Sequence, residues 1–190
     1  DAHGFGICGP QGRGSLAAAG LTGANASPRV LYMGTLSKSA GVAGGFVAGS
    51  NTLIEWLLQR TRSYTFATAA PGMLARALQQ SLSAMEEGDH LRSQLQARIA
   101  QLRAGLAPVL AITGWQLLPS NTPIQALVIG DNSKALQLME ALRERSIWVP
   151  AIRPPTVAAG TARLRIALSA AHTHPDIVQL VNALQEIEGR

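Results

Sequence analysis

Cysteine, aromatic residues and charged residues are all scarce in this 190-residue chain. It has one cysteine, Cys8, with 4% aromatic and 14% charged residues against 47% hydrophobic residues. A single cysteine excludes an intrachain disulfide, which agrees with a cytoplasmic location. The low charge content predicts that part of the surface faces another segment or subunit.

Long apolar runs and clusters of basic residues are missing as well. No run reaches the roughly eighteen residues of a membrane span, and residues 1–4 lack the basic start of a signal peptide. The net charge is +5, but the 16 basic residues are dispersed and are not interleaved with aromatic residues. We therefore expect no membrane partner and no nucleic-acid partner.

The beginning of the chain is rich in glycine. Residues 4–14 hold five glycines, which predicts a loop. Residues 4–9 match the G-x-G-x-x-G pattern, but Pro10 and the residues after it make a poor helix start, so a dinucleotide site is disfavoured. Because the chain opens on Asp1 directly in this stretch, we interpret it as the middle of a larger protein.

Hydrophobic periodicity predicts a mixed α/β chain with two parts. Short apolar runs at residues 29–33 and 45–48 predict strands of a parallel sheet, buried on both faces. Helices are expected over residues 51–62, 71–88, 89–108, 133–145 and from 175 onward, and further strands over residues 124–129, 147–150 and 163–168. We place a domain boundary between residues 1–88 and a small α+β domain, residues 89–190.

Lys38 is a candidate catalytic residue. It is one of only two lysines and lies in a loop of small residues, with Thr35, Ser37 and Ser39 beside it. An exposed loop lysine is the simpler interpretation. A Schiff-base lysine is the alternative, since imine formation requires a neutral amine with room for a flat cofactor, and neighbouring hydroxyls suit a phosphate.

Two further features bear on the same hypothesis. His3, taken alone, is a loop histidine, but together with Lys38 it places two chemically useful side chains at strand ends. Arg163 and Arg165 alternate in an expected strand, so both guanidinium groups share a face. Paired arginines beside a Pro-Pro-Thr loop suit the capture of a small carboxylate, although a solvated edge strand is the simpler reading.

Three motifs together resemble a known enzyme family. D-A-H-G-x-G begins at Asp1, G-T-L-S-K-S-A-G covers residues 34–41, and R-P-P-T-V-x-x-G-T-A-R-L-R-I-x-L-S-A-A-H-T covers residues 153–173. These segments resemble the C-terminal half of the α-oxoamine synthases, pyridoxal-phosphate (PLP) enzymes of the aspartate-aminotransferase fold type. The third motif favours the member that makes 8-amino-7-oxononanoate for biotin. The resemblance implies that residues 1–88 are the C-terminal part of a large PLP-binding domain.

The resemblance also implies roles for individual residues. Lys38 would form the Schiff base with PLP and move the substrate proton, and His3 would hydrogen-bond the phenolic oxygen of the cofactor. Thr35 would contact the phosphate, and Thr68 would reach the phosphate of the neighbouring subunit of a homodimer. Two residues would bind substrates, namely Arg165 for the alanine carboxylate and Thr156 for the acyl group.

The implied reaction is a decarboxylative condensation of L-alanine with a pimeloyl thioester, carried on CoA or on a carrier protein. A glycine-using relative such as 2-amino-3-ketobutyrate CoA ligase, and a non-catalytic binding module, are the alternatives. One departure matters. The family's carboxylate for the pyridine nitrogen lies three residues before the histidine, whereas Asp1 lies two before His3. We therefore expect an N-terminal half to be missing, and the chain alone to be inactive and poorly stable.

Overall fold

The computed structural model describes residues 1–188 and divides the chain into two compact units. The first is Asp1–His90 and the second begins at Leu91. Among these residues, none of the helices combines the length and apolar character needed to cross a membrane. Each unit has its own secondary structure and is described by itself.

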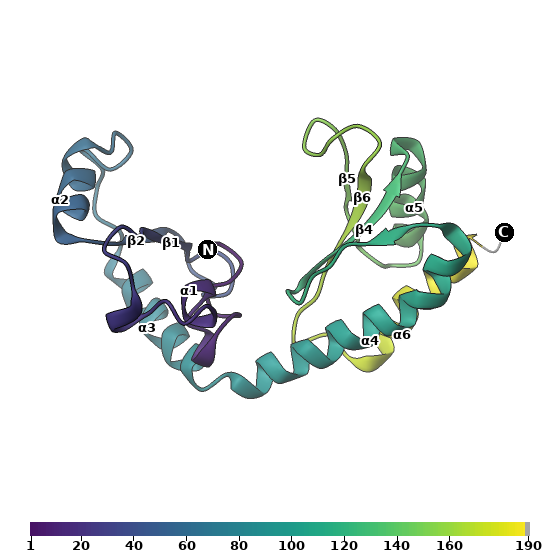
Figure 1. Cartoon of the computed structure of the whole chain (residues 1–190), viewed down its shortest axis with the longest axis horizontal. Helices are drawn as coiled ribbons and strands as arrows, with labels where there is room; N and C mark the ends of the chain where they lie inside the picture. Colours follow the sequence, from purple (N-terminus) through teal and green to yellow (C-terminus); the bar gives the residue numbers. More distant parts are fainter. Residues whose placement is uncertain (189–190) are drawn as a thin grey trace. The chain divides into compact units, whose positions relative to one another are not determined.

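The first unit combines a small sheet with helices (Figure 1). Strands β1 (Tyr32–Thr35) and β2 (Gly45–Ala48) pair antiparallel, with Tyr32 opposite Ala48 and Thr35 opposite Gly45. The other elements, in chain order, are the 3-10 helix η1 (Pro10–Gly12), α1 (Ser15–Ala18), the 3-10 helix η2 (Gly23–Asn25), α2 (Asn51–Arg60) and α3 (Gly72–Glu86).

The prediction of two strands buried in a parallel sheet is wrong for these residues. β1 and β2 are antiparallel to each other, and Gly34 is the only one of their eight residues that is buried. Met33 is 62% exposed and Val47 42% exposed, so neither side chain is buried in this unit. An apolar run shows that a strand can be buried, but it does not show how the strand pairs or how much of it is covered.

The second unit is a four-stranded antiparallel sheet with helices, in the strand order β3-β4-β6-β5. Its elements are α4 (Asp89–Thr113, of which the first two residues belong to the first unit), β3 (Gln116–Leu117), β4 (Ile124–Gly130), α5 (Asn132–Glu144), β5 (Ala151–Ile152), β6 (Ala162–Ala167) and α6 (His174–Glu188). The core is aliphatic, and its completely buried members include Leu102, Leu106, Leu127, Leu142, Leu164 and Leu184. Burial of these side chains is the main stabilising contribution of the unit.

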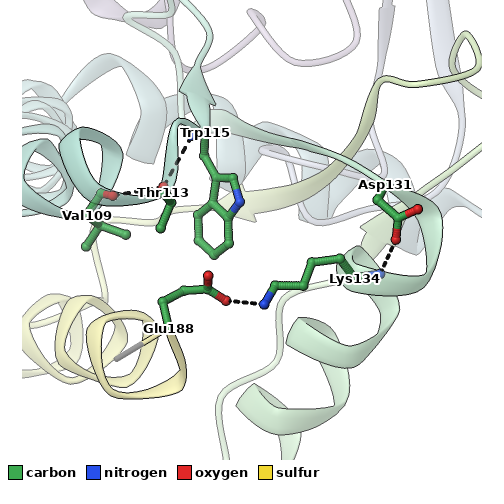
Figure 2. A network of polar contacts seen from close by, with 6 residues as sticks. All are labelled: Val109, Thr113, Trp115, Asp131, Lys134 and Glu188. Atoms are coloured by element: carbon green, nitrogen blue, oxygen red, sulfur yellow. Dashed lines mark hydrogen bonds and ion pairs between the residues drawn. The ribbon is translucent and has the colours of Figure 1, made fainter. Parts of the chain in front are cut away.

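Helix α4 corrects one sequence prediction. It does not end at Pro108 but continues to Thr113. Proline removes one backbone donor, while the next residue, Val109, is buried and keeps the helix on the core. At the C-terminal end the Thr113 hydroxyl donates to the Val109 carbonyl at 2.8 Å and accepts from the Trp115 amide at 3.2 Å (Figure 2).

Polar contacts fix the ends of the helices in this unit. Asp131 caps α5 by accepting a 2.7 Å hydrogen bond from the Lys134 amide. The Lys134 ammonium in turn lies 2.7 Å from the Glu188 carboxylate at the end of α6 (Figure 2). The expected strand over residues 147–150 is absent, and β5 forms directly after it, at Ala151–Ile152.

Candidate functional site

The loop that presents Lys38 joins β1 to β2. Backbone hydrogen bonds close it: Leu36 donates to the Gly44 carbonyl and Val42 to the Leu36 carbonyl, both at 2.9 Å. A tighter turn lies inside, where the Gly41 amide donates to the Lys38 carbonyl at 3.0 Å and Gly41 has a φ of 65°. A side chain at that position would be strained, so the small residues of the motif serve the turn.

Lys38 and Thr35 are neighbours in the structure. The exposed Lys38 ammonium donates to the Thr35 hydroxyl at 3.4 Å, and that hydroxyl donates to the Ala2 carbonyl at 3.3 Å. Ala2 directly precedes His3, which is also exposed. Within residues 1–188, no carboxylate forms an ion pair with Lys38. The structure thus brings Thr35 and Lys38 together, with the amine facing the Thr35 hydroxyl, and the contact of Thr35 with Ala2 places the segment of His3 beside them.

Asp1 lies in the same part of the unit, but its carboxylate is hydrogen-bonded to Ser15 and Tyr32. One carboxylate oxygen, Oδ2, accepts from the Ser15 amide at 2.8 Å and from the Tyr32 hydroxyl at 2.7 Å. The other, Oδ1, accepts from the Ser15 hydroxyl at 2.6 Å. Burial, followed by an electrostatic contribution from Cys8, raises the pKa of Tyr32, so this phenol remains a donor at neutral pH. Sequence reasoning missed this network, which joins three separated segments.

An aromatic cluster lies behind the loop. The Phe46 ring packs edge to face against Phe5 and Tyr32, with ring centroids 5.1 and 5.5 Å away. It also covers Gly34, where an added Cβ would lie 2.6 Å from the Phe46 ring. Only glycine fits there, and the cluster ties the His3 segment to the strands that carry Lys38.

Thr68 is not brought to these residues in the described chain. It lies in the exposed segment between α2 and α3 and makes no hydrogen bond to His3, Thr35 or Lys38. The same unit contains an apolar cavity of about 460 Å³ between the two strands and α2, whose lining includes Met33, Phe46, Val47, Ile54, Leu57 and Tyr64.

In the second unit, β6 carries both arginines on one face. Leu164 and Ile166 face the core, so Arg163 and Arg165 share the opposite face, as the alternation predicted. The Arg163 guanidinium folds back on its own strand: Nε donates to the Thr161 carbonyl and Nη2 to the Thr161 hydroxyl, both at 3.0 Å. Arg163 is therefore occupied in holding the Thr161 turn.

Arg165 lines a cavity of about 650 Å³. Trp148 and His172 are also part of the lining, and the Trp148 side chain is 71% exposed. His172 Nδ1 accepts from the Ser169 amide at 3.0 Å, which fixes the imidazole beside the end of β6. These two residues were not singled out from the sequence, although His172 lies in the third motif. A cation beside apolar walls suits a small carboxylate ligand.

Asp176, at the cavity rim, organises the start of α6. Its carboxylate accepts from the Thr173 amide at 2.7 Å and from the Thr173 hydroxyl at 2.8 Å. The backbone hydrogen bond, followed by the hydroxyl, holds the pKa of Asp176 below its ordinary value. The arrangement is a cap near the N-terminus of α6, where a negative charge is favourable.

Thr156 lies in the exposed Pro-Pro-Thr loop between β5 and β6. Its amide donates to the Arg153 carbonyl at 3.0 Å, and the loop ends in a turn where the Thr161 hydroxyl donates to the Ala158 carbonyl at 2.7 Å. Because the Arg163 guanidinium donates to the Thr161 hydroxyl, it fixes the end of the loop that carries Thr156.

Curated relatives match nearly the whole chain. It is 71% identical to the 8-amino-7-oxononanoate synthase of Delftia acidovorans over 187 residues, which are 98% of this chain and 46% of that protein. It is 70% identical to the enzyme of the same name from Paracidovorax citrulli, with 98% of this chain and 45% of that protein covered. The chain therefore spans about half the length of these relatives.

Solved structures share the fold. The serine palmitoyltransferase of Sphingomonas wittichii matches with a TM-score of 0.84 and 28% identity over 98% of this chain and 45% of that one. The 8-amino-7-oxononanoate synthase of Francisella tularensis matches with a TM-score of 0.83 and 26% identity over 100% of this chain and 54% of that one. The predicted α/β fold class is confirmed. The aminotransferase class I and II family matches residues 2–184, and the chain belongs to that family.

Proposed function

We propose that this chain is the C-terminal half of a PLP-dependent acyltransferase that condenses L-alanine with a pimeloyl thioester to give 8-amino-7-oxononanoate in biotin biosynthesis. The observation that carries the proposal is the contact of the Lys38 amine, which donates to the Thr35 hydroxyl at 3.4 Å in a loop of small residues. The 71% identity to a relative of that name supports the choice of reaction.

The residues around Lys38 fit the cofactor. A phosphate takes hydroxyl and amide donors, and Thr35, Ser37 and Ser39 supply hydroxyls at the loop. Imine formation needs an unprotonated amine, and a paired carboxylate would stabilise the protonated form; among the described residues no carboxylate forms an ion pair with Lys38. The cofactor would supply the electron sink that stabilises a carbanion at the alanine α-carbon. One of the structural neighbours is a serine palmitoyltransferase with a PLP internal aldimine.

Each of the predicted residues of the first unit has a separate role in the proposed reaction. Lys38 Nζ takes the α-proton of the amino acid and returns a proton later. His3 donates a hydrogen bond to the phenolic oxygen of the cofactor, and Thr35 binds its phosphate. Thr68, which contacts none of these three, reaches the phosphate held by a second copy of the chain. We therefore propose a homodimer. We also propose a cytoplasmic location, with which the single cysteine agrees.

Substrate binding falls to the second unit. Arg165 binds the alanine carboxylate, because its side chain lines the 650 Å³ cavity. Thr156 lines the acyl site from the loop that ends at Thr161. The acyl donor is a pimeloyl thioester of CoA or of a carrier protein.

The test uses a chimera, in which the preceding half of the Delftia acidovorans relative is joined to residues 1–190 of this chain. We expect it to consume a pimeloyl thioester when L-alanine is added, and to release CO₂ with the C₉ product. Higher turnover with glycine would favour the glycine-using alternative. No turnover and no visible absorbance after addition of PLP would favour a binding module and contradict the proposal.

A further inference from the structure

Asp1 is the acidic residue closest in sequence to His3, yet its contacts are not those of a group free to act on a ligand. Both carboxylate oxygens are used, with three hydrogen bonds from Ser15 and Tyr32 between 2.6 and 2.8 Å. Ser15 begins α1 and Tyr32 begins β1. One side chain thus joins the end of the glycine-rich loop to the strand that leads to Lys38.

The glycines of the first motif make room for this carboxylate. A Cβ added to Gly4 would collide with Asp1 Oδ1, and one added to Gly14 would collide with Asp1 Oδ2 and the Tyr32 hydroxyl. Gly14 also has a φ of 92°, which other residues rarely adopt. Two glycines, ten residues apart in the chain, therefore leave the space that the Asp1 carboxylate occupies.

The loop between Asp1 and Ser15 folds on itself as a unit. The Cys8 amide donates to the Gly4 carbonyl, and the Gly14 amide donates to the Cys8 carbonyl, both at 2.7 Å. His3 lies at the start of this loop, so it moves with whatever holds the loop to β1. The loop has its own reporter, because Cys8 is the only cysteine of the chain and is partly exposed.

We propose that Asp1 is a positioning residue that holds the His3 segment against β1 by hydrogen bonds from Ser15 and Tyr32, and that this clamp sets His3 for its contact with the cofactor. The second part rests on the proposed function, whereas the clamp itself does not. The role differs from that of a carboxylate paired with the pyridine nitrogen, since the Asp1 oxygens are already committed to Ser15 and Tyr32.

Substitution by asparagine separates the two roles. An asparagine keeps one oxygen for the Ser15 amide and the Tyr32 hydroxyl, and its amide group donates to the Ser15 hydroxyl, which accepts as readily as it donates. The clamp survives in Asp1→Asn and is lost in Asp1→Ala. A carboxylate that acts through its charge fails equally in both variants. Asparagine therefore rescues a clamp and does not rescue an electrostatic partner.

The experiment measures three properties of the chimera and of its Asp1→Asn, Asp1→Ala and Tyr32→Phe variants. These are the rate at which a thiol reagent modifies Cys8, the affinity for PLP, and the pH at which the visible absorbance of the bound cofactor changes. We expect Asp1→Ala to speed Cys8 modification and weaken PLP binding by about tenfold, and Asp1→Asn to stay within about threefold of the unsubstituted chimera.

The pH readout separates positioning from a general loss of stability, because His3 acts on the protonation of the bound cofactor only when it is in place. We expect the midpoint to shift in Asp1→Ala and in Tyr32→Phe, and to be restored in Asp1→Asn. Equal damage by Asn and Ala overturns the proposal, as does unchanged Cys8 modification in Asp1→Ala. If Asp1→Ala does not fold, the Tyr32→Phe variant is the test. An unchanged rate of Cys8 modification together with an unchanged pH midpoint in Tyr32→Phe would overturn the proposal. If no variant takes up PLP but Cys8 modification follows the expected order, the proposed function fails and the clamp stands.

Discussion

Replacement of Arg165 tests the assignment of the carboxylate site. In the chimera, Arg165→Ala removes the guanidinium that lines the 650 Å³ cavity and leaves the loop around Lys38 unchanged. Loss of one partner of a buried charge pair costs about 2–5 kcal/mol. Because Arg165 is only partly buried, we expect the lower end, about 2 kcal/mol, which is about a thirtyfold rise in the KM for alanine.

The matched control lies two residues away on the same strand face. Arg163 has the same side chain and donates to Thr161 at 3.0 Å through two nitrogens, so Arg163→Ala releases the turn that ends the Thr156 loop. We expect it to raise the KM for the pimeloyl thioester and to leave the KM for alanine within about threefold. The visible absorbance of bound PLP should be the same in both variants.

The assay is steady-state release of CO₂ with one substrate varied at a time. The two variants should affect different substrates, which is a stronger result than loss of activity in either one. An alanine KM that is unchanged in Arg165→Ala, or raised equally in Arg163→Ala, would refute the reasoning from β6.

Three other predictions concern stability and assembly. Arg103→Met removes the 2.7 Å donor to the completely buried Gln125 amide oxygen, and chemical denaturation should show a loss of about 1–3 kcal/mol. The pKa of Asp176 is lower in the folded protein than its unfolded value of 3.8, so the Asp176 carboxylate stabilises the fold above pH 3.8 and this contribution disappears as the pH falls through the folded pKa. The difference in thermal stability between the protein and Asp176→Asn should therefore vanish in acid. Residues 1–190 expressed alone should associate, because Met33 and Val47 are exposed, and a monodisperse monomer with one sharp unfolding transition would contradict this.

The sequence predicted those features that depend on local chemistry or on short periods. The alternation of Arg163, Leu164, Arg165 and Ile166 gave the faces of β6 correctly, because side chains in a strand alternate with period two. The small residues around Lys38 predicted a loop, and hydrogen bonds close that loop. Both features are encoded within a few consecutive residues.

Contacts between distant segments were beyond the reach of the sequence. The Asp1 clamp joins residues 14 and 31 positions apart, and no local pattern marks such a contact. The packing of Val109 carries α4 past Pro108, so a tertiary contact overrides a local helix-breaking signal. The pairing of β1 and β2 was misjudged for a similar reason, since an apolar run indicates burial without indicating the partner.

The assignment of Lys38 as the cofactor-bearing residue is tested most directly by reductive trapping. The chimera is loaded with PLP, reduced with borohydride, digested and mapped by mass spectrometry. The second lysine of the chain is an internal control, because Lys134 is held by Glu188 at 2.7 Å. Our account predicts the label on Lys38 and its loss in Lys38→Arg. A label on Lys134, or on neither lysine, would contradict it.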